Sequence, residues 1–76
     1  MQILIIEDDV PLAQGLAFHL RHEGFAVDVH EDGLSGIEAA AQGKYELILL
    51  DRMLPGMDGV QILKRLREKH ISTPVL

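Results

Sequence analysis

Short apolar runs alternate along this chain with longer stretches in which apolar residues recur every three or four positions. The runs at 3–6, 47–50 and 74–76 are apolar throughout and have the length of strands. Residues 25–30, FAVDVH, alternate apolar and polar side chains, which is typical of a strand with one polar side. The pattern therefore predicts four strands.

The three intervening stretches carry helix signals. Asp9 is a predicted N-cap with Pro11 in the first turn, and this helix ends at Gly24. Its apolar residues recur every fourth position, at Leu12, Leu16 and Leu20, with Ala13 and Ala17 beside them. Asp32 begins a second helix, which passes through Ile37 and Ala40 to Gly43. Asp58 and Gln61 form a capping pair for a third helix, with Val60, Leu63 and Leu66 on one stripe.

Strands that alternate with helices predict an α/β fold with a parallel sheet. Helices then cover both faces of the sheet, which explains why residues 47–50, LILL, are continuously apolar. Right-handed crossovers put the first helix on one face and the second and third on the other. One alternate set of the LILL side chains, with part of the fourth strand, then lacks a cover.

Composition limits the function. The chain has 76 residues, of which 47% are hydrophobic, so it forms one domain with a small core. Twelve acidic against seven basic residues give a net charge of −5, the wrong sign for binding nucleic acid through phosphates. The absence of cysteine, of a signal-peptide pattern and of a membrane-length apolar run leads us to expect a cytoplasmic protein without a membrane partner.

Acidic residues follow two of the predicted strands. Glu7 and Asp8 come after residues 3–6, and Asp51 comes directly after residues 47–50. Ligands of open parallel sheets bind beyond the carboxyl ends of the strands, so these three carboxylates are expected to converge if the two strands are neighbours. An all-oxygen cluster suits Mg²⁺ or a similar hard ion. An aspartate beside such an ion is a candidate nucleophile toward phosphorus.

Other polar groups favour structural roles. His19 and His22 are spaced to share a metal, but their charged neighbours favour a solvated helix face. A solvated face is also the interpretation for the basic cluster of Lys64, Arg65, Arg67 and Lys69. The Pro55–Gly56 pair predicts a turn that redirects the chain into the third helix.

Four segments together resemble a known family. They are ILIIEDD, the DG of HEDGLSGIEAA, YELILLDRMLPGMDGVQILKRLR and TPVL, and they span the chain. They are similar to response-regulator receiver domains of two-component signalling, and most similar to receivers attached to winged-helix transcription factors. The resemblance implies a flavodoxin-like (CheY-like) three-layer fold. It also implies that a sensor histidine kinase phosphorylates Asp51 with Mg²⁺, so that the receiver catalyses only its own phosphorylation and dephosphorylation.

The same resemblance implies the ligand set. Asp8 and Asp51 would ligate Mg²⁺ directly, Glu7 would act largely through water, and the backbone carbonyl of Met53 would supply another oxygen. Arg52 and Met53 occupy variable positions of the family, so their side chains are assigned no chemistry.

The chain also departs from the family pattern. Residues 1–76 cover about the first two thirds of a receiver, through part of the fourth strand. The family's hydroxyl residue at that strand's end and its phosphate-contacting lysine are absent, and Lys44, Lys64 and Lys69 lie elsewhere. We therefore expect a truncated receiver with impaired activity, in which DNA binding belongs to an output domain outside this chain.

Three alternatives remain open. A structural half-domain would self-associate to complete its sheet or core, with vestigial acids, and a homo-oligomer is expected for this reason. A haloacid-dehalogenase-like phosphatase usually has a second aspartate two residues after the first, where this chain has Met53. A nucleotide-binding flavodoxin-like protein would need a phosphate loop after the first strand, where EDDVP has the opposite charge.

Overall fold

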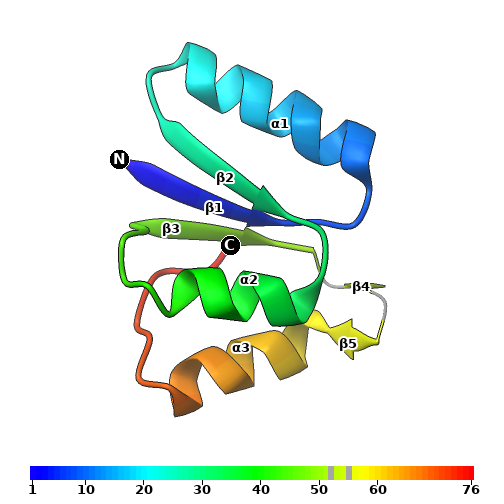
Figure 1. Cartoon of the computed structure of the whole chain (residues 1–76), viewed down its shortest axis with the longest axis vertical. Helices are drawn as coiled ribbons and strands as arrows, with labels where there is room; N and C mark the ends of the chain where they lie inside the picture. Colours follow the sequence, from blue (N-terminus) through cyan, green and yellow to red (C-terminus); the bar gives the residue numbers. More distant parts are fainter. Residues whose placement is uncertain (52, 55) are drawn as a thin grey trace.

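The computed structural model describes residues 1–51, 53–54 and 56–76 (Figure 1). Three strands, β1 (Gln2–Ile6), β2 (Ala26–His30) and β3 (Leu47–Leu50), alternate with α1 (Val10–His22) and α2 (Gly33–Ala40). A small hairpin, β4 (Met53–Leu54) and β5 (Met57–Asp58), then leads into α3 (Gly59–Glu68). The element order matches the predicted strand–helix alternation, and the hairpin is an addition to it.

The central sheet is parallel, in the order β2-β1-β3. The predicted fourth strand is present as one parallel bridge, in which Val75 lies beside Ile48. Backbone N–H groups of Ile48 and Leu50 donate to the carbonyls of Pro74 and Leu76, at 2.9 and 3.0 Å. The C-terminal residues therefore extend the sheet next to β3, which makes β1 an inner strand and β3 its neighbour on the side of the C-terminus.

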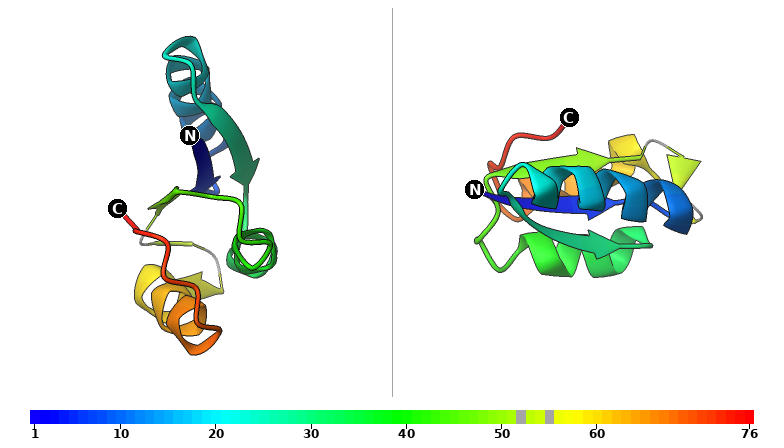
Figure 2. Two further views of the ribbon diagram at one scale, coloured as in Figure 1. Left: turned by 90° about the vertical axis from the view of Figure 1, so that its left-hand side faces the viewer. Right: turned by 90° about the horizontal axis from the view of Figure 1, so that it is seen from above.

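The helices cover the two faces of the sheet as the crossover rule predicts. Helix α1 packs over one face, and α2 and α3 lie against the other (Figures 1 and 2). The α1 side of the core contains Ile3, Ile5 and Val27, and the opposite side contains Leu4, Ile6 and Ile48. In β3 only Ile48 is fully buried, while Leu47, Leu49 and Leu50 are half-buried. Leu47 and Leu49 lie on the α1 side, where they are only partly covered, as expected for one alternate set of the LILL side chains.

The helices bury different residues from those the apolar spacing emphasised. In α1 the buried side chains are Ala13 and Ala17, whereas Leu12 is 50% exposed and Leu16 39% exposed. Small alanines let the helix backbone approach the sheet, and the leucines flank this contact. In α3 the buried face contains Ile62 and Leu66, and the members of the expected stripe at 60 and 63 lie outside it.

Close packing of α2 on the sheet depends on Gly36. A Cβ atom at this position would lie 2.6 Å from the Cδ1 atom of Ile6, which is itself completely buried. A side chain here would therefore force either the buried Ile6 side chain or α2 itself to shift. Because α2 begins directly after the carboxyl end of β2, this contact also fixes the helix beside the edge of the sheet where the acidic residues lie.

The predicted helix starts are confirmed. The carboxylates of Asp9 and Asp32 accept hydrogen bonds from the backbone N–H groups of Leu12 and Ser35, at 3.1 and 2.9 Å. Asp58 and its partner at position 61 form a complete capping box. Pro55 lies outside the described residues, so of the predicted turn only Gly56, with φ +75°, is described.

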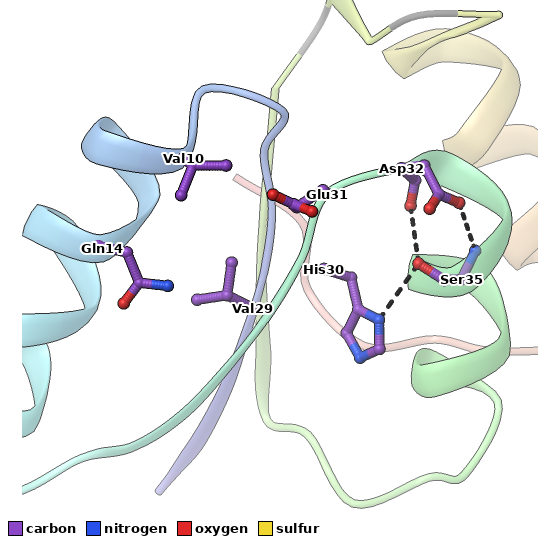
Figure 3. Close-up of a pocket in the computed structure, with 7 residues that line it drawn as sticks. All are labelled: Val10, Gln14, Val29, His30, Glu31, Asp32 and Ser35. Carbon is purple, nitrogen blue, oxygen red and sulfur yellow. Dashed lines mark hydrogen bonds between the residues drawn. The ribbon is translucent and has the colours of Figure 1, made fainter.

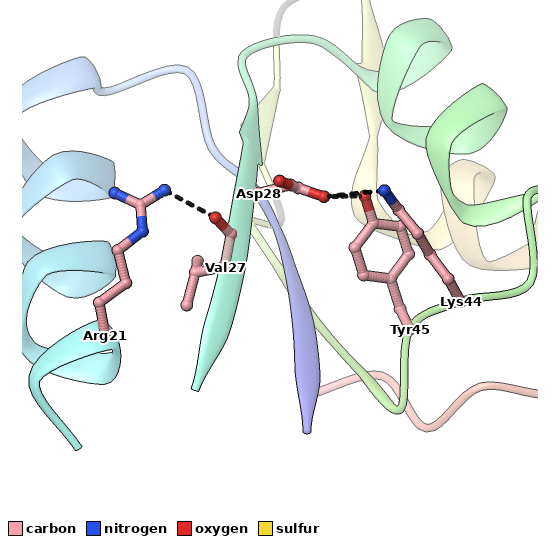
Figure 4. A network of polar contacts seen from close by, with 5 residues as sticks. All are labelled: Arg21, Val27, Asp28, Lys44 and Tyr45. Carbon is pink, nitrogen blue, oxygen red and sulfur yellow. Dashed lines mark hydrogen bonds and ion pairs between the residues drawn. The ribbon is translucent and has the colours of Figure 1, made fainter. Parts of the chain in front are cut away.

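A tyrosine in the segment before β3 is hydrogen-bonded to a carboxylate on β2. The hydroxyl of Tyr45 donates to Oδ2 of Asp28 at 2.5 Å, and the ammonium of Lys44 lies 3.5 Å from the same oxygen (Figure 4). The hydrogen bond from Tyr45 lowers the pKa of Asp28, with Lys44 adding to the effect. Burial and the carboxylate together raise the pKa of Tyr45 to about 12. This bond ties the segment before β3 to β2.

We expect Tyr45→Phe to lower the free energy of unfolding by about 1 kcal/mol at neutral pH, because the half-exposed Asp28 carboxylate loses its hydrogen-bond donor. The contribution of Asp28 is present above its ordinary pKa of 3.8 and disappears as the pH falls through the lowered value. The contribution of Tyr45 is present below its ordinary pKa of 10.0 and disappears as the pH rises through about 12. Urea unfolding across this pH range measures the difference.

Lys44→Met is the matched control, since it removes the exposed ion pair and leaves the tyrosine bond in place. Exposed ion pairs contribute less than about 1 kcal/mol, so the control is expected to unfold close to the wild type. If Tyr45→Phe lowers the free energy of unfolding by the same amount at acid pH as at neutral pH, the effect comes from packing and not from the bond to the Asp28 carboxylate.

Candidate metal and phosphoacceptor site

Strand register brings the acidic residues together. Ile6 pairs with Leu50 at the carboxyl ends of β1 and β3, so the next residues, Glu7 and Asp51, lie side by side. The backbone ladder continues past the strand ends. The N–H of Asp51 donates to Ile6 and that of Glu7 donates to His30, both at 3.0 Å. These bonds fix the backbone of two of the three acids.

The three predicted side chains form one cluster. A carboxylate oxygen from each of Glu7, Asp8 and Asp51 lies within 4.8 Å of the others. Glu7 and Asp51 are half-buried, and Asp8 is exposed. Three carboxylates open to solvent on one side match the needs of Mg²⁺, which takes a few protein oxygens and keeps several waters. The donor set therefore fits this ion. The backbone carbonyl of Met53, in β4, stays a predicted ligand.

The environment of Glu7 reflects negative charge held close together. Burial raises the pKa of Glu7, and the neighbouring Asp51 raises it further as a hydrogen-bond partner and as a negative charge. A hydrogen bond from the backbone N–H of Asp9, 3.1 Å from Oε2, partly offsets the rise. This hydrogen bond was not predicted. The position of Glu7 two residues before the N-cap Asp9 is the sequence feature that would have indicated it. A bound cation would stabilise the ionised form of all three groups.

The other candidate groups remain apart from this cluster. His19 and His22 are exposed on α1, where the ring of Phe18 packs against both. The four residues of the basic cluster, on α3 and at its C-cap, are also exposed, as expected. Arg67 also makes structural contacts, because its guanidinium donates to the backbone carbonyls of Ile71 and Thr73. It holds the segment that leads from α3 to the last strand.

Two hollows lie at the carboxyl ends of the strands, and one of them borders the cluster. One, of about 420 Å³, lies between α1 and the start of α2 (Figure 3). Part of its polar lining is used within the fold, since Nδ1 of His30 lies 3.2 Å from Oγ of Ser35 and Asp32 caps α2. The other, of about 230 Å³, borders the cluster itself, with Leu16, Leu49 and Leu76 beside the carboxylates of residues 7 and 51. These apolar neighbours of the cluster were not predicted. The sequence pattern emphasised the leucines of α1, whereas the helix buries Ala13 and Ala17 and leaves Leu16 at the hollow.

A parallel α/β sheet with carboxylates at adjacent strand ends defines a flavodoxin-like protein with an acidic site. The family model of the response regulator receiver domain matches residues 3–76, and the chain belongs to this family. It is 46% identical over 74 residues to an uncharacterized transcriptional regulatory protein, YkoG, of Bacillus subtilis, covering 97% of this chain and 32% of that protein. It is 45% identical to the transcriptional activator protein PfeR of Pseudomonas aeruginosa, covering 99% of this chain and 24% of PfeR.

Solved receiver domains have the same fold. The receiver domain of the Francisella response regulator 1452 matches with a TM-score of 0.91 and 32% identity, over 97% of this chain and 61% of that one. The receiver of the hybrid histidine kinase CckA gives 0.90 and 31%, over 99% and 71%. The chain thus spans about a third or less of the two curated relatives named here. None of the helices in the described part of the chain has the length and apolar character needed to cross a bilayer.

Proposed function

We propose that this chain is the phosphoacceptor part of a two-component response regulator, with Asp51 as the residue that takes the phosphoryl group. The convergence of Glu7, Asp8 and Asp51 within 4.8 Å at adjacent strand ends carries the proposal. Asp51 is the proposed acceptor because it directly follows the apolar strand β3, next to β1, and borders the open hollow. Membership of the receiver family supports a sensor histidine kinase as the donor.

In the transfer, the carboxylate of Asp51 would act as the nucleophile. One of its oxygens forms a bond to phosphorus as the P–N bond of a phosphohistidine breaks. The imidazole leaves with the electron pair and takes up a proton, and the product is an acyl phosphate. Bound Mg²⁺, held by Asp8, Asp51 and the Met53 carbonyl with Glu7 acting through water, would neutralise charge on the transferring group. The chain would catalyse only its own phosphorylation and dephosphorylation.

We further propose that the output of the complete protein is transcriptional and of the winged-helix class. YkoG, a transcriptional regulatory protein, and PfeR, a transcriptional activator, support a transcriptional output. The resemblance of the EDD and DRMLPGMDG segments to receivers of winged-helix transcription factors supports the class. DNA binding would then belong to an output domain outside residues 1–76, in agreement with the net charge of −5. The proposed location is the cytoplasm, where a kinase domain would meet its receiver.

Acetyl phosphate tests the acceptor directly. With Mg²⁺ present, we expect the 76-residue chain to gain one phosphoryl group, slowly, because the phosphate-contacting lysine of the family has no counterpart among its residues. Borohydride reduction of the acyl phosphate, followed by peptide mass spectrometry, locates the modified residue. A modified peptide that contains Asp51 supports the proposal. Modification of one of the four histidines instead would refute it.

A further inference from the structure

A short hairpin follows the strand end that carries Asp51. Its strands, β4 and β5, pair antiparallel, with Met53 opposite Asp58 and Leu54 opposite Met57. The hairpin begins two residues after Asp51 and leads directly into α3. Two residues per strand are too few to fix a hairpin in place through backbone hydrogen bonds alone. Its position relative to the acidic cluster therefore depends on side chains.

Two side chains of the hairpin reach the core. Leu54 is 5% exposed and belongs to the buried cluster between the sheet and the helices α2 and α3. Met57, its partner across the hairpin, is half-buried and packs against the same cluster. Met57 also borders an open hollow of about 310 Å³, which has Gly56 and Gln61 in its wall. The hairpin is thus held from the core side, and the hollow leaves room for it to move when that contact is lost.

Gly33 provides the seat for Met57. A Cβ atom at this position would lie 3.3 Å from Sδ of Met57 and 3.0 Å from Cδ1 of Ile62, so the missing side chain lets both approach the start of α2 (Figure 1). Gly33 is buried and follows the N-cap Asp32. The Asp-Gly pair at the start of α2 therefore has two separate roles, since the carboxylate caps the helix and the glycine receives the thioether.

The contacts of α2 connect the two chain segments that meet at the acidic cluster. One turn into the helix, Gly36 packs against Ile6, the last residue of β1. At its first residue, Gly33 packs against Met57, in the hairpin that follows β3. The backbone after β1 and the backbone after β3 are therefore positioned against the same helix.

We propose that Met57 is a positioning residue of the metal site: its side chain, seated on Gly33, holds the hairpin so that Asp51 and the backbone carbonyl of Met53 keep the placement that Mg²⁺ requires. The inference rests on the proposed metal and phosphoacceptor site and names the contact that sets its geometry. Mg²⁺ demands near-octahedral coordination, so a small displacement of the backbone that carries its ligands weakens binding. Groups that orient metal ligands without touching the ion contribute about 10- to 100-fold to affinity.

Met57→Ala tests the contact, because it removes the thioether and leaves all three carboxylates in place. We expect the dissociation constant for Mg²⁺, measured by isothermal titration calorimetry, to rise about tenfold. Met57→Leu keeps a side chain of similar volume and is expected to stay within about twofold of the wild type. Val27→Ala is the matched control, since it shortens a buried side chain on the opposite face of the sheet. It should lower the unfolding temperature, as Met57→Ala does, without changing Mg²⁺ affinity.

Gly33→Ala changes the same contact from the helix side, whether or not Met57→Ala folds. Its added methyl would crowd the sulfur of Met57, and we expect Mg²⁺ affinity to fall severalfold. When Gly33→Ala is combined with Met57→Ala, the methyl has no sulfur to displace, so the combined loss should be smaller than the product of the single losses. A role in stability alone would not produce this coupling in the dissociation constant.

The outcomes distinguish this inference from the proposed function. Wild-type Mg²⁺ affinity in both Met57→Ala and Gly33→Ala overturns the positioning role and leaves the metal site intact. A loss of affinity in Val27→Ala equal to that in Met57→Ala also overturns it. A wild-type chain that binds no Mg²⁺ contradicts the metal site itself, and the positioning role with it.

Discussion

Replacement of Asp8 and Asp51 together by alanine is expected to abolish saturable Mg²⁺ binding by the chain. The two residues supply two of the three carboxylates that lie within 4.8 Å of one another. The carboxylate of Glu7 alone would not compete with water for Mg²⁺. Isothermal titration calorimetry of the wild type and the double variant measures the loss. Affinity of the wild type should be modest, since much of the coordination shell remains water.

Glu7→Gln is expected to have a smaller effect, a loss of affinity of about tenfold, because Glu7 would act through water. Metal-ligating carboxylates bind the ion in their ionised form, so affinity should also fall at acid pH, where the raised pKa of Glu7 favours its protonated form.

In the metal-free protein, ionisation of Glu7 lowers the stability of the fold, whereas it favours Mg²⁺ binding in the metal-bound protein. A raised pKa contributes stability below the ordinary value of 4.5 and loses it as the pH rises through the raised value. Glu7→Gln should thus unfold at a slightly higher temperature at neutral pH without Mg²⁺.

The matched control replaces two exposed acids outside the cluster, Glu38 on α2 and Glu68 on α3, by alanine. This pair changes the net charge by the same amount as the Asp8 and Asp51 double variant. It separates a site from diffuse attraction of cations to an acidic protein. Unchanged Mg²⁺ binding in the Asp8 and Asp51 double variant, or equal losses in both double variants, would contradict the metal site.

Asp51→Asn should lower the rate of phosphoryl uptake by at least about a thousandfold, because an amide offers no anionic oxygen to attack phosphorus. The substitution keeps the size of the side chain, so the fold is retained. The rate is measured by incubating the protein with acetyl phosphate and Mg²⁺ and following the amount of phosphoprotein over time by intact-protein mass spectrometry. Asp8→Asn is expected to lower the rate of phosphoryl uptake by a smaller factor, because this variant keeps the nucleophile Asp51 and loses only a proposed metal ligand.

Asp9→Asn is the control for chemistry near the site, because asparagine also caps helices well and Asp9 lies next to the cluster without belonging to it. It should be phosphorylated at close to the wild-type rate. Undiminished phosphoryl uptake in Asp51→Asn would falsify the assignment of the acceptor and leave the fold and family unaffected.

The local features of this fold could be predicted because their causes are local. Asp9 and Asp32 cap helices through bonds to backbone groups three residues away, and a short polar side chain before an apolar repeat indicates such a bond. Runs of strand length that alternate with helices imply parallel strands, and a carboxylate at the end of a run then lies at the edge where ligands bind. Glu7, Asp8 and Asp51 could be named on this basis together with the family resemblance.

Contacts between distant segments could not be predicted in the same way. The leucine spacing of α1 and the alanines beside it are both compatible with a helix, and only packing against the sheet selects Ala13 and Ala17 as the buried face. Spacing likewise did not indicate that Tyr45 would donate to Asp28, 17 residues earlier in the chain.

Distances at the site depend on the pairing of strands. The sequence by itself determined that acids follow the strands at residues 3–6 and 47–50, since side-chain identity and strand length are local properties. Only the tertiary structure decided that β1 and β3 are neighbours in the register Ile6 to Leu50, which places Glu7 beside Asp51. A shift of one residue would turn one of these side chains to the other face of the sheet, and the cluster would not form. Register is set by the packing of α1, α2 and the core on both faces at once, and no single segment of the chain contains that information.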